Sequence, residues 1–207
     1  SQGAMLSIII PTLNEEEHLP VLLNSIRRQD FSDYEVIIAD AGSKDRTRKI
    51  ARDYDCHIVA GGLPGKGRNE GAKVSSGEFI LFLDADVMLK EGFLRKALEE
   101  LKSRGLDAAS FCLEPQTGSA LTRLLINLFY NWPIEFCEPF LAHGAQAILV
   151  RKGMHQRLGG FDEDIKLAED MEYVRRAKRI GRFGLLRSGR ILCSVRRFET
   201  DGWLRTY

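Results

Sequence analysis

The sequence predicts an α/β fold in which a mostly parallel central sheet is flanked by helices. Short apolar runs alternate along the chain with segments whose apolar residues repeat at helical spacing. The runs are almost continuous in valine, isoleucine, leucine and phenylalanine, which is typical of strands buried on both faces of a parallel sheet. With 207 residues, of which 44% are hydrophobic, the chain is long enough for one globular domain with a substantial core.

Each predicted strand is one of these apolar runs. Pro11 follows the first run directly, and we expect it to end that strand and to fix a turn. The predicted strands are 6–10, 35–39, 57–60, 79–83, 108–113, 146–150 and 191–195.

Two of the predicted helices follow residues that are good helix caps. Asn14 precedes the first helix and Ser43 the second, and both side chains can accept a hydrogen bond from a first helical turn. Segment 119–132 has two interpretations: a helix that packs on the core, or an amphipathic helix at a membrane surface or lipid-acceptor groove. The predicted helices are 15–29, 44–54, 66–76, 91–104, 119–132 and 168–180.

The charge of the whole chain indicates no particular partner, since the formal net charge is +1. We therefore expect no nucleic-acid partner. Basic side chains gather between Arg175 and Arg205, which predicts either an ordinary solvated surface or a peripheral contact with phosphates or an anionic membrane. No apolar run reaches the ~18 residues that a membrane-spanning helix needs.

The four cysteines are widely spaced, which is typical of small core residues rather than of a disulfide framework or a zinc site. This pattern predicts a reducing compartment, so we expect a cytoplasmic protein, either free or at the cytoplasmic face of the membrane. Residues 1–4 precede Met5 and resemble a cloning remnant, so the predicted single domain spans 5–207. The sequence leaves the oligomeric state open.

Parallel sheets bind ligands at the carboxyl ends of their strands, so the polar residues after each run form the candidate site. Asp40 follows the second run, where its carboxylate either accepts hydrogen bonds from a base or a ribose or simply completes a turn. Lys66 and Arg68 follow the third run in a glycine-rich segment. A flexible backbone that carries two cations can close over a diphosphate.

Asp84 and Asp86 follow the fourth run and are separated only by Ala85. On an extended chain, residues i and i+2 point the same way, so the two like charges repel each other. One hard cation, Mn²⁺ or Mg²⁺, would relieve this repulsion and complete its shell with water and a substrate phosphate. The other interpretation is a solvated turn.

Glu169 and Asp170 open the last predicted helix, where the helix dipole favours negative charge. Their position has two interpretations. Either they only complement the dipole, or one of them reaches the site and acts as a general base.

Four stretches in fixed order resemble the family 2 glycosyltransferases with the GT-A fold: "SIIIPTLNE", "IIADAGSKDRT", "GRNEGAKVSSGEFILFLDAD" and "LAEDMEYVRRAKRIG". The resemblance covers about residues 6–181. It implies an inverting, metal-dependent enzyme that moves one sugar from a nucleotide-diphosphate sugar to a hydroxyl or lipid-phosphate acceptor, carbohydrate or lipid-linked. Residues 5–90 would bind the donor and residues 91–207 the acceptor. No Q-x-x-R-W motif is present, so we expect non-processive transfer.

The resemblance also implies roles for single residues. The nucleoside pocket would be lined by Pro11, Thr12, Leu13 and Glu15, with Asp40 near the base and Arg68 and Lys66 near the nucleotide. The D-x-D motif is matched by Asp84, Ala85 and Asp86, and its two aspartates would hold the metal. The catalytic base is matched by Asp170, which Glu169 would support.

Two departures from the family pattern bear on specificity. Ala41 stands where many relatives carry a second aspartate that reads the base, so the identity of the nucleotide is open. Met88 stands where some relatives offer another metal ligand, and water would take that place.

Two other functions fit parts of the pattern. A catalytically inactive nucleotide-sugar-binding module would keep the fold without the reaction. A haloacid dehalogenase-type phosphatase also places D-x-D after an apolar strand, but it expects threonine or valine where this chain has Met88 and places the motif near the start of the chain.

Overall fold

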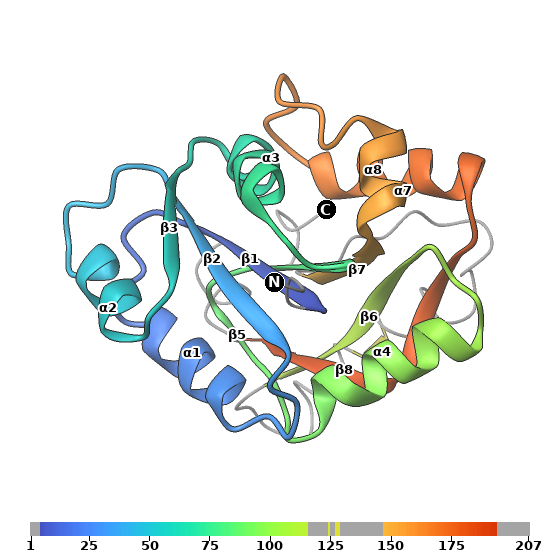
Figure 1. Ribbon diagram of the computed structural model, residues 1–207, viewed down its shortest axis with the longest axis horizontal. Helices are drawn as coiled ribbons and strands as arrows, with labels where there is room; N and C mark the ends of the chain where they lie inside the picture. The colour runs from blue at the N-terminus through green and yellow to red at the C-terminus, as the bar shows by residue number, and fades with distance from the viewer. Residues whose placement is uncertain (1–4, 116–123, 125–126, 129–146, 194–207) are drawn as a thin grey trace.

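The computed structural model describes residues 5–115, 124, 127–128 and 147–193. Within these residues the chain forms one curled eight-stranded sheet with helices on both faces (Figure 1). The strand order is β3-β2-β1-β4-β7-β6-β8-β5. The predicted α/β fold with a mostly parallel sheet is confirmed.

Within the described residues, every predicted apolar run lies in a strand; residue 146 of one run and residues 194–195 of another lie outside them. The structure adds the short strand β5 and extends the last predicted strand at its N-terminal side, since β8 begins at Phe183. The strands are β1 Leu6–Thr12, β2 Tyr34–Asp40, β3 His57–Ala60, β4 Phe79–Leu83, β5 Val87–Met88, β6 Ala108–Pro115, β7 Ala147–Arg151 and β8 Phe183–Cys193.

The sheet has a parallel half and a mixed half. Strands β3, β2, β1 and β4 all run parallel, so their carboxyl ends meet at one edge. Strand β7 then pairs antiparallel with both β4 and β6. Beyond it, β6 pairs parallel with β8, and β5 closes the far edge antiparallel to β8. The carboxyl edge of the parallel half is where a ligand is expected.

The helices cover the sheet in two groups, with α3, α7 and α8 above it and α1 and α4 below it in the view of Figure 1. The one described helix that the sequence did not predict is α7. The helices are α1 Leu19–Arg27, α2 Thr47–Asp53, α3 Pro64–Val74, α4 Phe93–Ser103, α7 Lys152–Leu158 and α8 Glu169–Ile180.

The two faces of the sheet bury separate apolar layers. On the lower face, β1 residues such as Ile8 pack with α1 and with Phe93 of α4. On the upper face, Ile9 packs with Ala72 of α3 and with Tyr173 of α8. Successive residues of β1 therefore point into different layers, which explains why its run is apolar at four of the five positions 6–10.

Part of the membrane prediction lies outside the described residues. Segment 119–132, apart from residues 124 and 127–128, is not described, and neither is the end of the basic region after residue 193. In the described part of the chain, none of the helices has the length and apolarity that crossing a membrane requires. A peripheral membrane contact stays a prediction.

The two predicted helix caps are wrong. Helix α1 begins at Leu19 and α2 at Thr47, several residues after Asn14 and Ser43. Instead, Asn14 has a left-handed backbone with φ 55°, and its N–H donates to Ser43 Oγ at 2.9 Å. The two residues bind each other's loops rather than their own helices.

The prediction that Pro11 ends the first strand is also wrong. Strand β1 continues through Pro11 to Thr12, in register with Ala39 and Asp40 of β2. Pairing of β1 with β4 has already ended at Ile9, so on that side the missing N–H of proline interrupts no ladder hydrogen bond.

The glycine-rich segment is a helix, so the interpretation as a flexible loop over a diphosphate is wrong. Helix α3 begins at Pro64, whose fixed φ suits a first helical position. Its glycines let it lie close to the sheet: a Cβ at Gly71 would sit 2.5 Å from Ile9 Cγ2. A Cβ at Gly67 would already touch Ala39 and Pro11, at 3.5 Å. Close packing, not flexibility, explains these glycines.

Candidate active site

The buried Arg68 of α3 joins two carboxylates from distant parts of the chain. Its Nη1 donates to Glu169 Oε1 at 2.5 Å, and its Nη2 donates to Asp84 Oδ1 at 3.1 Å. The side chain is only 9% exposed. Burial alone would lower the pKa of Arg68, but Asp84, Glu169 and Asp170 together raise it above its ordinary value. The guanidinium is therefore a fixed positive charge between the end of β4 and the start of α8.

Asp86 differs sharply from Asp84. Among the described residues, Asp86 Oδ1 is the buried side-chain oxygen without a hydrogen-bond partner. A buried carboxylate oxygen without a donor costs free energy, so native proteins rarely keep one without a reason. An oxygen in this state is suited to a cation or to a donor on a ligand.

Glu15, in the loop after β1, adds a third acidic group to this region. Burial raises the pKa of Glu15 above 4.5, and the charges of Asp86 and Asp84 raise it further. His18 opposes them, since its Nδ1 lies 3.2 Å from Glu15 Oε2. The carboxyl edge of β1 and β4 is therefore an acidic region with Arg68 as its buried counter-charge.

The donor set fits a hard cation that keeps other ligands. Asp84 and Asp86 supply carboxylate oxygens, and one of those oxygens has no other described partner. Within the described residues, no three acidic, histidine or cysteine side chains form a complete cage. Two carboxylates are the usual protein share for Mg²⁺, which takes its remaining ligands from water and phosphate.

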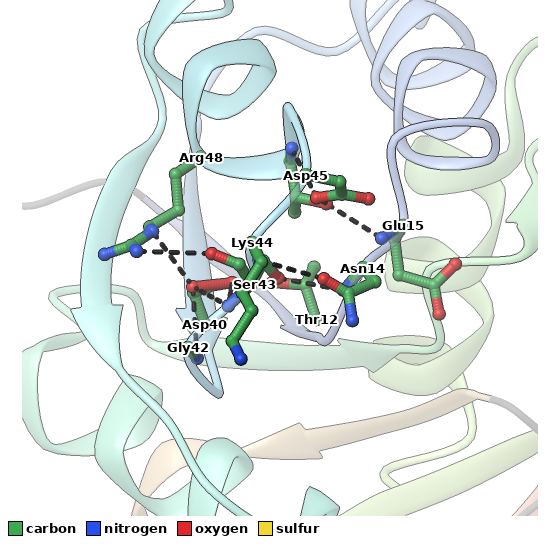
Figure 2. Close-up of polar contacts among 10 residues, drawn as sticks. Thr12, Asn14, Glu15, Asp40, Gly42, Ser43, Lys44, Asp45 and Arg48 are labelled. Carbon is green, nitrogen blue, oxygen red and sulfur yellow. Dashed lines mark hydrogen bonds and ion pairs between the residues drawn. The ribbon is translucent and has the colours of Figure 1, made fainter.

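Asp40, at the end of β2, is held from several sides (Figure 2). Its Oδ1 accepts from the N–H groups of Gly42 at 3.2 Å and Ser43 at 3.0 Å. Its Oδ2 accepts from Thr12 Oγ1 at 3.3 Å, and Arg48 Nε lies 3.4 Å from Oδ1. The carboxylate is only 3% exposed. Asp40 therefore fastens the turn after β2.

Hydrogen bonds between two loops fix the surroundings of Asp40. Figure 2 shows the loop after β1 lying beside the loop after β2. Asn14 donates its N–H to Ser43 Oγ, and its Oδ1 accepts from the N–H of the next residue, Lys44, at 2.9 Å. Glu15 N donates to Thr47 Oγ1 at 2.8 Å. The main chain that carries Glu15 is thus set by the neighbouring loop.

The structure brings together most of the predicted site residues. Lys66 is different, because it is exposed on α3 while Arg68 is buried. Leu13 is 55% exposed beside the site, and Pro11 lies under Gly67. The residues gathered at the edge are Thr12, Glu15, Asp40, Arg68, Asp84, Ala85, Asp86, Glu169 and Asp170.

Sequence reasoning missed Asn69, which positions the segment before α8. Its Nδ2 donates to Phe161 O at 2.9 Å, and its Oδ1 accepts from Phe161 N at 2.8 Å. Ala168, with φ 60°, then starts the turn into α8. The position of Asn69 directly after the candidate Arg68 was the available signal in the sequence.

Comparison with known proteins gives the same result as the motifs. The profile described as glycosyl transferase family 2 matches residues 7–145. An uncharacterized glycosyltransferase of Bacillus subtilis (strain 168), EpsJ, is 30% identical over 188 residues, which cover 82% of this chain and 54% of that protein. This chain therefore spans about half the length of that relative.

Solved structures of glycosyltransferases are similar in fold. The crystal structure of S. aureus TarS 1–349 in complex with UDP has a TM-score of 0.73 and 25% identity, and the match covers 92% of this chain and 60% of that TarS 1–349 chain. The mannosyltransferase PcManGT from Pyrobaculum calidifontis, in complex with GDP-Man and Mn²⁺, has a TM-score of 0.74 and 22% identity, covering 93% and 57%. With the family match extending over more than half of its length, this chain belongs to glycosyl transferase family 2 and has its GT-A fold.

Proposed function

We propose that this domain moves one sugar, with inversion, from a nucleotide-diphosphate sugar to an acceptor hydroxyl, and that it uses Mn²⁺ or Mg²⁺. One observation carries the proposal. Arg68 joins Asp84, which stands beside the metal candidate Asp86, to Glu169, which stands beside the base candidate Asp170. Donor-binding and acceptor-activating groups thus belong to one cluster, although they come from opposite halves of the chain.

Each group has a distinct task in this proposal. Asp84 and Asp86 hold the divalent cation, which when bound supplies positive charge to the departing diphosphate. Arg68 holds Asp84 in place through the hydrogen bond from its Nη2 to Asp84 Oδ1. The loop that carries Thr12 and Glu15 lines the nucleoside site, and its hydrogen bonds to the next loop exist before any ligand arrives.

Asp170 acts on the acceptor side. It is the second residue of α8 and lies close enough to Arg68 to affect the pKa of that guanidinium. A hydroxyl acceptor must lose a proton as it attacks, and a carboxylate at this place can take it. Glu169, bound to Arg68, fixes the first turn of α8 and so positions Asp170.

The test starts with calorimetric titration of nucleotide sugars in the presence of Mn²⁺, followed by a transfer assay with a panel of acceptors. We expect Asp170→Asn to bind the donor as the unchanged protein does and to transfer about 10²-fold more slowly, the usual scale for a general base. Normal transfer by this variant would remove Asp170 from the mechanism. It would instead favour a lipid-phosphate acceptor, which is already an anion and needs no base.

The other two functions make different predictions in the same assays. A binding module would bind a nucleotide sugar and neither transfer the sugar nor hydrolyse the donor. A phosphatase would cleave a generic phosphomonoester and lose that activity in Asp84→Asn. Membership of family 2 and the place of the acidic pair after the fourth strand of the chain favour the transferase.

A further inference from the structure

Two adjacent residues of α3 hold the two ends of the segment between α7 and α8. Asn69 binds Phe161 near the start of this segment, and Arg68 binds Glu169 at its end. The residues between these two attachments, 162–168, are mostly exposed. Because both ends of the segment are fastened to neighbouring positions on one helix, α3 sets the path by which the chain enters α8.

The side-chain amide of Asn69 binds both main-chain polar groups of Phe161. Its Nδ2 donates to Phe161 O at 2.9 Å, and its Oδ1 accepts from Phe161 N at 2.8 Å. The same Nδ2 also donates to Glu163 Oε1 at 2.9 Å. Gly160 makes room for this amide, because a Cβ at Gly160 would lie 2.6 Å from Asn69 Oδ1. Asn69 is 9% exposed, and a buried amide with all these bonds holds the main chain of Phe161 in one position.

The ring of Phe161 connects this attachment to α8. It stacks on the ring of Tyr173, with the two ring centroids 4.1 Å apart, and Arg68 Cζ lies 5.2 Å from the centroid of the Phe161 ring. Tyr173 is fully buried, and its hydroxyl oxygen lies 2.8 Å from His155 Nδ1 of α7. Phe161 therefore lies between the guanidinium of Arg68 and the first part of α8, in contact with both.

Asp170 lies between the two points at which α8 is held. Glu169 is bonded to Arg68, and Tyr173, nearly one turn beyond Asp170, packs on Phe161. Two attachments about one turn apart fix both the place and the rotation of a helix, and so the direction of the side chain between them. Without Asn69 the main chain of Phe161 loses its anchor, and one of the two attachments loosens.

We propose that Asn69 is a positioning residue for sugar transfer, which through Phe161 holds the first turn of α8 so that Asp170 reaches the acceptor. This inference rests on the proposed function. The hydrogen bonds of Asn69 go to Phe161 and Glu163, neither of which belongs to the donor site. Its loss should therefore slow transfer and leave donor binding unchanged. A misplacement of about 1 Å costs a catalytic group up to about 10²-fold in rate.

The test measures donor binding and turnover separately in Asn69→Ala. UDP-GlcNAc, UDP-glucose and GDP-mannose are titrated calorimetrically in Mn²⁺, and turnover is followed as release of the nucleotide, with water or a panel of sugars as acceptor. We expect an unchanged dissociation constant for the donor and a kcat lower by about 10- to 100-fold. Amide hydrogen exchange of segment 161–170, measured without ligand, should become faster, because Phe161 N loses its acceptor.

The Asp170→Asn background decides whether the loss of rate acts through the base. When the base is absent its position no longer matters, so adding Asn69→Ala should slow Asp170→Asn no further. A purely structural loss would instead multiply with that of Asp170→Asn. If Asn69→Ala does not fold, Phe161→Leu keeps the main-chain bonds and removes the ring that packs on Tyr173. It should show the same loss of rate and the same lack of additivity.

Glu100→Ala is the matched control. Glu100 of α4 also holds a distant main-chain segment from a helix, since its Oε2 accepts from the N–H groups of Arg187 at 3.0 Å and Ser188 at 2.8 Å. Helix α4 covers the opposite face of the sheet from α3 and α8 (Figure 1). This variant should lose stability in urea unfolding, as Asn69→Ala does, and keep the turnover of the unchanged protein.

The outcomes separate the inference from the proposed function. If Asp170→Asn is slow but Asn69→Ala, or Phe161→Leu in its place, turns over normally, the role of Asn69 is overturned and the proposed function stands. The same holds if the losses multiply, if exchange of segment 161–170 is unchanged, or if Glu100→Ala loses as much turnover. If the unchanged protein releases nucleotide from none of the three donors, or if Asp170→Asn is as fast as the unchanged protein, the proposed function fails as stated, and this inference fails with it.

Discussion

Asp40 and Asp86 are the same residue type at the ends of two strands of one sheet. The hydrogen bonding of their carboxylates is nevertheless opposite. Asp40 receives two main-chain N–H groups, a hydroxyl and a guanidinium. Asp86 has a buried oxygen that no described donor reaches. The carboxylate of Asp40 is fully hydrogen-bonded within the fold, whereas that of Asp86 has a buried oxygen without a described donor.

The course of the chain after each aspartate explains the difference. After Asp40 the chain turns back at Gly42, whose φ of 94° suits glycine, and this turn brings its own N–H groups to the carboxylate. After Asp86 the chain runs straight on into β5, which pairs with β8. Main-chain donors that belong to a sheet ladder cannot fold back onto a side chain.

The largest predicted effect is on ligand binding at Asp86. Asp86→Ala should abolish Mn²⁺-dependent binding of nucleotide sugars, because it removes the oxygen that is left open for the cation. The free energy of unfolding without ligand should stay equal or rise by up to about 1 kcal/mol, because a buried oxygen without a donor is lost. Titration calorimetry and urea unfolding measure the two quantities. Unchanged binding would mean that Asp86 is not a metal ligand.

Arg68→Met tests the positively charged partner of Asp84, the guanidinium of Arg68. The change leaves the two largely buried carboxylates of Asp84 and Glu169 without their cation, which should cost about 3 kcal/mol of unfolding free energy. Arg27→Met is the control, because Arg27 pairs at 3.9 Å with the 96%-exposed Asp55, and such pairs contribute less than ~1 kcal/mol. Equal losses in the two variants would show that the Arg68 bridge does not stabilise the fold.

Asp40→Ala should affect stability rather than the cation. Two main-chain N–H groups lose their acceptor, and Arg48 loses its counter-charge, so we expect a loss of about 2 kcal/mol in urea unfolding. Asp53→Ala, at a 56%-exposed position of α2, should cost much less. Asp40→Ala should therefore lower the unfolding free energy, whereas Asp86→Ala should abolish Mn²⁺-dependent binding without lowering it. If both aspartates can be replaced without loss of stability, the contrast between them is not energetic.

The smallest effect is a pH dependence that comes from Glu15. Burial and the charge of Asp86 raise its folded pKa above 4.5, so the folded state binds the proton more tightly than the unfolded state. This contribution to stability is complete below pH 4.5 and is lost as the pH rises through the raised pKa. Glu15→Gln should remove that decline, and Asp86→Ala should reduce it. Urea unfolding over a pH series measures the slope, and identical slopes in all three proteins would contradict the coupling.

Most of the fold follows from local sequence, because the strands are continuous apolar runs. The errors have one physical cause: contacts between residues far apart in the chain. Asn14 and Ser43 look like helix caps, but 29 positions apart they bind each other's loops. Pro11 looks like a strand end, and only the point where β4 stops pairing shows that a proline is tolerated there.

The site was predictable as a set of residue types but not as an arrangement. Strand-end position alone identified Asp40, Asp84 and Asp86. That Arg68 would bond a carboxylate 101 positions away could not be read from the chain, since the pairing depends on how α3 and α8 pack on the sheet. Nor does sequence distinguish the satisfied Asp40 from the open Asp86, because the difference lies in where the following main chain goes.

Strand β7 has a consequence for how the protein is made. It pairs antiparallel with β4, although 63 residues separate the end of β4 at Leu83 from the start of β7 at Ala147. While the ribosome is still adding the intervening residues, one edge of β4 has no partner strand, and all five residues of β4 are apolar and buried in the complete structure. An unpaired apolar edge of this kind invites pairing with other chains. A fragment cut after residue 90 would keep that edge permanently and should aggregate, so residues 5–90 are not expected to fold as a separate unit.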